Sequence, residues 1–257
     1  MSALDRTDAP VSFSGSNFQL WNVEFRPTES GGRPRVTFEG VHWYVDADSR
    51  SSVESGLIEL EFSQDTATGL IAGVFGSPAL LLADASPHTD SNGHLWPDVR
   101  PHTWITANTL AYGADIWDAA GNFVGGELHT RTYDPATSTW GGPSPALTTD
   151  TNRALYALNA SPSGGSLLYA NNQGIFEVPV SGGTVLCWIA TKGTRKGEVR
   201  PEGGDYVDDN MIAYNLHDID TMGGSLSTST LYRKTRSGTT TQLTKSTQPY
   251  AQMVHAR

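Results

Sequence analysis

Residues 158–183 have the pattern of a strand-turn-strand unit. It opens with a Ser-Pro-Ser-Gly turn at 161–164, continues in a short apolar run and turns again through Asn-Asn-Gln-Gly at 171–174. A second apolar run follows and ends at the Gly-Gly pair 182–183. Short apolar runs between such turns are typical of β-strands, and no long segment has the 3.6-residue apolar period of a helix. The pattern predicts an all-β fold.

Further runs of strand length occur on the N-terminal side, at 36–45, 57–62 and 70–75, and a run at 79–83 fits a strand or a short helix. Residues 1–12 are polar and predict a flexible N-terminal tail. The chain has 257 residues, and all-β folds of this length are commonly single domains, so we expect residues 13–257 to form one all-β domain.

A tyrosine recurs within the apolar runs at positions 112, 169 and 214, which are 57 and 45 residues apart. Both spacings are near the length of one β-propeller blade. The stretch Val-His-Trp-Tyr at 41–44 is a candidate fourth copy.

The unit at 158–183 resembles the repeat of TolB-type (WD40-like) β-propellers, in which a Ser-Pro-Asp-Gly turn precedes a strand of leucine, an aromatic and a small residue. Ser163 stands where that repeat has Asp. Residues 133–140 are similar to the Tyr-Asp-Pro-x-Thr-x-x-Trp corner of kelch blades, and 238–244 to the end of a TolB outer strand. The resemblance covers mainly residues 103–244. It implies a small propeller of four to six blades, closed by pairing of the chain ends, with a β-sandwich or barrel as the alternative.

The chain has 27 acidic and 17 basic residues, giving a formal net charge of −10. Nucleic-acid binding needs a basic stripe, so we expect no nucleic-acid partner and favour neutral or basic partners. The single Cys187 excludes an internal disulfide, and its apolar neighbours predict a buried position. No signal peptide or membrane-length apolar run is present in the chain as given. We therefore expect a soluble protein, cytoplasmic or released without Sec export, with no membrane insertion.

The polar stretch 84–101 predicts a long inserted loop, and such loops are usually functional or disordered. Imidazole and carboxylate groups are concentrated in and beside it, at His88, Asp90, His94, Asp98 and His102. These groups suit zinc, and Asp-Ser-Asn-Gly at 90–93 begins like a calcium loop, although a solvated loop without metal is the alternative. We expect no other cofactor. Trp96 is the candidate for an exposed aromatic contact, and we predict that this loop is a binding appendage.

His217, Asp218 and Asp220 are the candidates for catalysis, because a histidine and two carboxylates adjoin the end of a predicted strand. Further carboxylate pairs at 46/48 and 208/209 could serve a glycosidase in a propeller channel, although Asp is also a common turn residue. Motifs for acyl hydrolysis, nucleotide binding and NAD binding are absent from the sequence. Trp104, Trp117 and Trp140 recur at similar positions and are expected to pack in the core.

The resemblance to TolB-type propellers implies partner binding, and no candidate group has a spacing that catalysis would require. The expected function is therefore non-catalytic recognition of a protein or a glycan through loops between the strands. The alternative is a carbohydrate-active or other hydrolytic enzyme with carboxylates in the channel.

Overall fold

The structure of the chain is a computed structural model. It describes residues 11–13, 16–27, 32–45, 51–65, 67–83, 88–89, 95–96, 99–120, 122–137, 139–151, 153, 155, 157–191, 198–219 and 226–246. In this described part every regular element is a strand, so the predicted all-β class is confirmed. None of it forms a helix of the length and apolar character needed to cross a membrane.

The strands of the first half are β1 (Val11–Phe13), β2 (Ser16–Arg26), β3 (Arg35–Val45), β4 (Ser51–Gln64), β5 (Ile71–Ala83), β6 (His88–Thr89), β7 (Leu95–Trp96), β8 (Val99–Thr106), β9 (Thr109–Trp117) and β10 (Phe123–Asp134). The second half contributes β11 (Thr139–Trp140), β12 (Thr148–Thr151), β13 (Ala157–Ala160), β14 (Ser166–Asn171), β15 (Gly174–Pro179), β16 (Leu186–Ala190), β17 (Val199–Asp208), β18 (Met211–Ile219), β19 (Leu226–Thr235) and β20 (Thr240–Ser246).

Strands that follow one another in the chain lie next to one another in the sheets. Among the described residues, β1 to β5 form one sheet in chain order, β8 to β11 a second with β12 paired to β10, β13 to β16 a third and β17 to β20 a fourth, while β6 and β7 form a short pair. Within β1 to β5 and within β13 to β20, all neighbours in a sheet pair antiparallel. Antiparallel neighbours need only tight turns, which explains the many Gly, Asn and Asp residues between the apolar runs.

The chain divides into two compact units. The first comprises residues 1–110 and 132–141, and the second comprises residues 111–131 and 142–257. The predicted single domain of 13–257 stays a prediction, and each unit is described by itself below.

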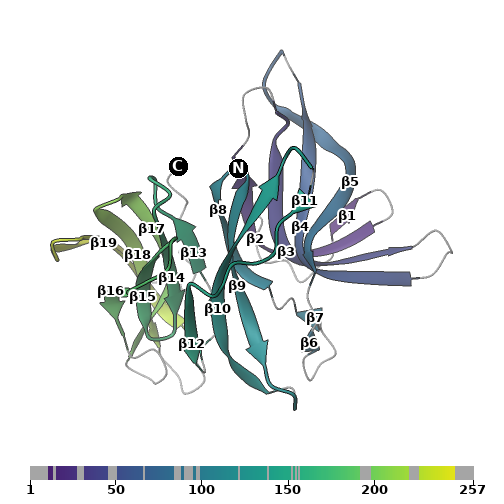
Figure 1. The fold of residues 1–257 in the computed structure, drawn as a ribbon. Helices are drawn as coiled ribbons and strands as arrows, with labels where there is room; N and C mark the ends of the chain where they lie inside the picture. The colour runs from purple at the N-terminus through teal and green to yellow at the C-terminus, as the bar shows by residue number, and fades with distance from the viewer. Residues whose placement is uncertain are drawn as a thin grey trace. The chain divides into compact units, whose positions relative to one another are not determined.

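The first unit is organised by the sheet β1 to β5, drawn from purple to blue in Figure 1. Phe38 of β3 lies opposite Ile58 of β4, and both are buried together with Leu60. Because side chains alternate between the faces of a strand, these apolar residues gather on one face of the sheet. Val23, Phe62, Val74 and Leu80 pack against them.

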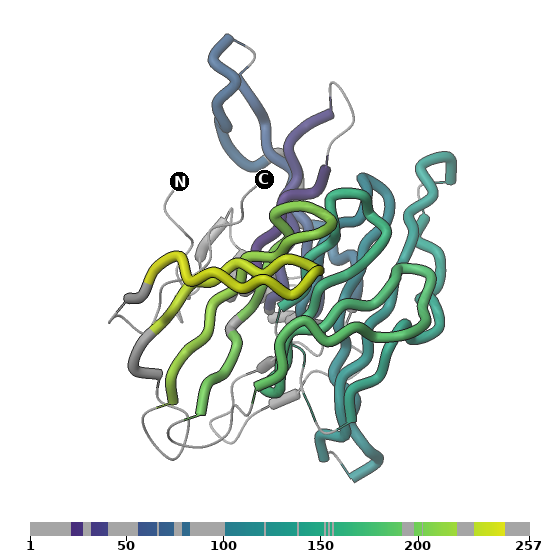
Figure 2. The backbone as a smooth tube through the Cα atoms, turned by 90° about the vertical axis from the view of Figure 1, so that its left-hand side faces the viewer, coloured from purple at the N-terminus to yellow at the C-terminus, as the bar shows by residue number. Residues whose placement is uncertain are grey.

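The second unit has its core between the sheets β13 to β16 and β17 to β20, whose course runs from green to yellow in Figure 2. Leu168, Ile175 and Ile212 are buried there with aromatic residues from β16, β17 and β18. Asn159 Nδ2 of β13 donates a hydrogen bond of 2.7 Å to the carbonyl oxygen of Gly204 in β17. Apolar packing and this buried polar contact together join the two sheets of the second unit.

The three tyrosines aligned in the sequence occupy equivalent places in three sheets. Tyr112, Tyr169 and Tyr214 lie in β9, β14 and β18, each the second strand of its sheet in chain order, and all are buried. Each ring stacks on a ring of the third strand: Tyr112 on His129 at 5.7 Å, Tyr169 on Phe176 at 5.5 Å and Tyr214 on Tyr232 at 5.4 Å between centroids. The tyrosine spacing in the sequence therefore marks a repeated structural unit.

The Ser-Pro-Ser-Gly turn at 161–164 is hydrogen-bonded to a carboxylate from a distant part of the chain. Ser163 donates through its backbone N–H and its hydroxyl to Asp209 Oδ1, at 3.2 and 2.8 Å. Gly164 closes the turn with a φ of 70°, which favours glycine. Asp209, from the turn between β17 and β18, thus ties this turn to the neighbouring sheet.

Two expectations from the sequence change with the structure. The run 79–83 belongs to β5, which begins at Ile71, so the helical alternative is wrong. The polar stretch 84–101 is not all loop, because β6 pairs with β7, with His88 opposite Trp96, and β8 begins at Val99.

Candidate functional site

A cleft in the first unit begins where β2 ends. Arg26 is the last residue of β2, and Pro27 after it has no N–H to continue the ladder. The Arg26 guanidinium is almost completely buried and donates from Nε to the carbonyl oxygen of Ala107 at 2.8 Å. Its Nη1 donates to both carboxylate oxygens of Glu59, at 2.9 and 3.3 Å. A buried charge is tolerated because its partners are provided by the fold.

Three aromatic rings surround the same guanidinium. Its central carbon lies 4.5 Å from the ring centre of Trp104, 5.4 Å from that of Tyr133 and 5.9 Å from that of Trp140. The face of an aromatic ring attracts a cation, and Arg also stacks on it through its planar group. Arg26 therefore joins β2 to the aromatic residues of β8, β10 and β11.

Two more arginines continue the charge pattern on β3 and just before it. Arg33 Nη1 lies 3.1 Å from Glu61 Oε1, and Arg35 Nη2 lies 3.1 Å from Glu61 Oε2. Arg35 also reaches Glu59, at 3.8 Å. Guanidinium and carboxylate groups alternate along this network, and the Arg33 and Arg35 side chains remain 48% and 37% exposed. Cationic groups thus face the solvent at this edge.

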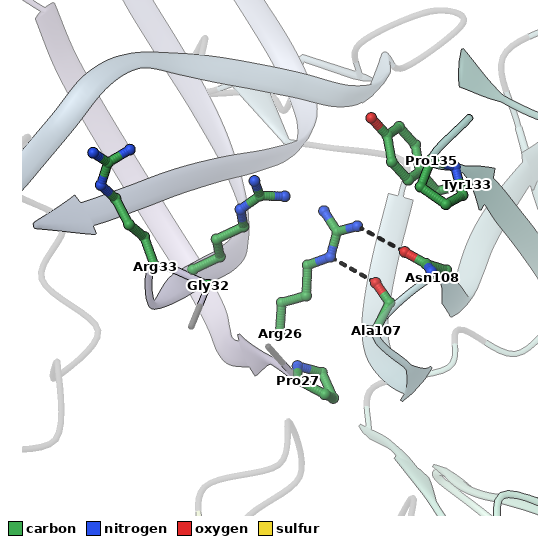
Figure 3. A pocket seen from close by; sticks show the side chains of 9 residues that line it. Arg26, Pro27, Gly32, Arg33, Ala107, Asn108, Tyr133 and Pro135 are labelled. Carbon is green, nitrogen blue, oxygen red and sulfur yellow. Dashed lines mark hydrogen bonds between the residues drawn. The ribbon is translucent and has the colours of Figure 1, made fainter. Parts of the chain in front are cut away.

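These arginines line a cavity of about 300 Å³, shown in Figure 3. Its lining residues are Arg26, Pro27, Gly32, Arg33, Arg35, Ala107, Asn108, Tyr133 and Pro135. Among the described residues, this lining includes three guanidinium groups and no carboxylate, and Glu59 and Glu61, which pair with the arginines, are not among the lining residues. We call this cavity the arginine cleft.

The sequence alone does not predict the arginine cleft. Its arginines are distant in sequence from Asn108 and Tyr133, and the Arg-Pro-Arg at 33–35 is too short to stand out in an acidic chain. Of its residues, only Tyr133 and Pro135 belong to a recognisable sequence pattern, the kelch-like corner at 133–140, and that pattern predicts a turn rather than a binding site. In that corner Asp134 accepts hydrogen bonds from the N–H of Ala136 and the hydroxyl of Thr137, and the bond from Ala136 does most to lower the pKa of Asp134.

His102 was expected among the contact groups of the 84–101 loop, and the structure corrects this. It lies in β8 and is 1% exposed. Its Nε2 is 2.9 Å from Thr37 Oγ1, which also accepts a hydrogen bond of 2.9 Å from Trp104 Nε1. His102 Nδ1 has no hydrogen-bond partner and lies 3.9 Å from Glu39 Oε1. His102 is part of a buried polar network because strand pairing continues through its position.

The other loop candidates are barely described. Asp90, His94 and Asp98 lie outside the described residues, and of His88 and Trp96 only the backbone pairing is described. Their binding and metal roles stay predictions. Within the described part of the chain, no group of three or more His, Cys, Asp or Glu side chains is arranged to hold a metal ion.

The catalytic candidates are separated by burial. His217 is 2% exposed in β18, and its Nε2 lies 3.1 Å from Asn215 Nδ2. The neighbouring Asp218 is partly exposed, and Asp220 lies outside the described residues. A general base must reach the proton that it removes, and the burial of His217 does not favour that role.

The remaining candidates have structural partners. Asp208 Oδ1 accepts a hydrogen bond of 2.7 Å from the N–H of Asn210, and Asp209 binds Ser163 as described, so this pair serves turns. The other pair, at 46/48, is outside the described residues. Trp104 is buried as expected, and Trp140 and Trp117 pack against aromatic neighbours, Trp104 and Phe123.

Cys187 was expected in the core but is exposed. It lies on the edge strand β16, where side-chain alternation directs the adjacent Trp188 inward. Partial burial of the thiol raises the pKa of Cys187, with an opposing effect from Lys234.

A second arginine-carboxylate cluster lies in the second unit. Arg236 Nη2 is 3.0 Å from both carboxylate oxygens of the buried Glu177, which also accepts a hydrogen bond of 2.8 Å from Trp188 Nε1. Arg236 stacks over Trp188 at 5.0 Å. Burial, and then the negative charge of Glu177, raise the pKa of Tyr206. Arg236, Glu177 and Trp188 satisfy one another, so they hold β15 and β16 to the β19–β20 turn.

Comparison with known proteins gives no assignment. No protein-family model matches the chain, and no curated protein matches it. The resemblance to TolB-type and kelch-type repeats therefore rests on the sequence patterns at 133–140, 158–183 and 238–244 alone.

Proposed function

We propose that the chain is a non-catalytic recognition module that binds its partner through the arginine cleft. The observation that carries this proposal is the cleft lining, which in the described part of the chain offers three guanidinium groups and a tyrosine and no carboxylate. Arg is the side chain best suited to paired recognition of carboxylate and phosphate groups. The partner therefore presents an anionic group, in place of the neutral or basic partner that the net charge of the chain suggested.

The scaffold that we propose for this module is a small four-bladed propeller. It is supported by the four main sheets of neighbouring antiparallel strands and by the stacked tyrosine at the same place in three of them. In this scaffold each sheet is one blade. A crystal structure tests it directly: four sheets around a common axis are expected, and two stacked sheet layers would favour the sandwich instead.

Preorganisation of the cleft also supports recognition. Arg33 and Arg35 are held by Glu61, and Arg26 is fixed by Glu59 and three rings. Side chains that are already ordered lose less conformational entropy when a ligand binds, so more of the interaction energy appears as affinity.

The test is a binding screen of the full chain against immobilised glycans and peptides of different charge. We expect saturable binding to anionic probes, without turnover, that is lost in the double variant Arg33→Ser/Arg35→Ser. Arg233→Ser is the matched control, because Arg233 is an exposed strand arginine that does not line the cleft. Binding that the double variant leaves unchanged would rule out the cleft. Turnover abolished by Asp218→Asn or Asp220→Asn would establish the hydrolytic alternative.

A further inference from the structure

The size of the arginine cleft limits what it can bind. Its volume of about 300 Å³ is at the lower end of the range of small-molecule sites. The ligand group that enters the cleft is therefore small, about the size of one or two sugar or amino-acid residues.

The arginines are already arranged for a carboxylate. Arg35 donates from Nε to Glu61 Oε2 at 3.2 Å, and its Nη2 lies 3.1 Å from the same oxygen, while Arg33 pairs with Oε1. A guanidinium has five N–H donors, so Arg35 keeps further donors beyond those directed at Glu61. A ligand carboxylate on the cleft side would accept hydrogen bonds from these further donors, as Glu61 does on the other side.

The rest of the lining suits a sugar ring. Tyr133 and Pro135 form one wall of the cleft, on the other side of Arg26 from Arg33 in Figure 3, and Asn108 lies beside them. Tyr133 is half-buried: its ring centre lies 5.3 Å from that of Trp140 and 5.4 Å from the guanidinium carbon of Arg26, and the residue also lines the cleft. A flat aromatic side chain next to an amide matches the apolar face and the hydroxyl groups of a pyranose.

An extended peptide is less well matched, because it would need open backbone groups for a strand-like ladder. At the cleft, the carbonyl oxygen of Ala107 already accepts from Arg26 Nε. The carbonyl oxygen of Asn108 accepts from the N–H of Tyr133 at 2.8 Å. These two carbonyl groups are used within the fold, which disfavours strand-like pairing of a peptide with residues 107–108.

We infer that the arginine cleft binds a uronate residue of an acidic glycan, with the carboxylate on Arg33 and Arg35 and the sugar ring on Tyr133. This inference rests on the proposed recognition function and names its ligand class.

The test measures binding of the full chain by isothermal titration calorimetry with trigalacturonate, its methyl ester, a triglutamate peptide and inorganic phosphate. Trigalacturonate is expected to bind, and its uncharged methyl ester at least about tenfold more weakly, since charge-assisted hydrogen bonds are lost. Arg33→Gln and Tyr133→Leu should each weaken trigalacturonate binding by about tenfold. Arg233→Gln should leave it unchanged, and thermal melting verifies that each variant is folded.

The outcomes separate the inference from the proposed function. If triglutamate or phosphate binds more tightly than trigalacturonate, and Arg33→Gln weakens that binding, the glycan inference fails while recognition by the cleft stands. If no anionic probe binds, or Arg33→Gln changes no affinity, the cleft is not the binding site and both fail. If Tyr133→Leu fails to fold, Arg33→Gln and the methyl ester still decide the result.

Discussion

The central guanidinium carbon of Arg26 lies 4.5 Å from the ring centre of Trp104, and this pair joins the end of β2 to β8 inside the first unit. The same guanidinium neutralises Glu59, whose side chain is 10% exposed. Electrostatics and aromatic packing thus converge on one side chain, which at the same time lines the arginine cleft.

Arg26→Lys should destabilise the first unit although it keeps the positive charge. Lysine has neither the planar face for Trp104 nor the fork that reaches Glu59 and Ala107 together, and we expect a loss of about 2 kcal/mol. Arg26→Met also leaves Glu59 without its closest cation, and the loss should reach about 3 kcal/mol. Chemical denaturation measures both. The control is Arg33→Lys, on an exposed pair, with an expected change below about 0.5 kcal/mol; equal losses in all three variants would contradict the assigned role of Arg26.

Thr37→Val should be more costly than the loss of one hydroxyl suggests. Thr37 Oγ1 accepts from Trp104 Nε1 and contacts His102 Nε2, and all three residues are buried. Valine keeps the shape but leaves two polar groups without partners, so the expected loss of unfolding free energy is about 2 to 4 kcal/mol. Thr132→Val, at an exposed position in β10, provides the comparison and should be nearly neutral. A Thr37→Val protein as stable as the parent would show that this network contributes little.

Gly174→Ala should destabilise the second unit because of a close approach between strands. A Cβ at Gly174 would overlap the carbonyl oxygen of Ile189 in β16, and it would lie 3.1 Å from the Phe176 ring. Relief requires a shift of β16, at a cost of about 1 to 3 kcal/mol. Gly142→Ala is the matched control, because nothing lies within 4 Å of the Cβ that it would add. The melting temperatures of the two variants measure this difference. An unchanged melting temperature for Gly174→Ala would mean that β16 shifts without a measurable loss of stability.

The second unit should lose stability at alkaline pH through Tyr169. Burial raises the pKa of Tyr169 from 10.0 to about 12, so the folded state favours the neutral phenol. The corresponding stability is fully present below pH 10 and is lost as the pH rises toward about 12, because the unfolded chain ionises first. Unfolding free energies across this window should fall more steeply for the parent than for Tyr169→Phe. Parallel curves for the two proteins would assign the alkaline loss to other groups.

The fold class and the repeated unit could be predicted from local patterns in the sequence. Apolar runs of strand length between Gly, Pro, Asn and Asp turns require β-strands, and Tyr112, Tyr169 and Tyr214 were correctly aligned because a residue on a given strand position meets the same neighbours in each sheet. These are local properties, set by side-chain alternation and turn chemistry within a few dozen residues.

Which polar groups are available for function depends on long-range packing and could not be predicted from the sequence. His102 and His217 resembled site residues in the sequence, but strand alternation places both in the interior, whereas Cys187 on an edge strand is exposed. The arginine cleft combines residues near 26–35, 107–108 and 133–135, which contact one another only after long-range strand pairing. Burial and convergence of this kind depend on contacts across about a hundred residues, and the order of residues along the chain does not contain them.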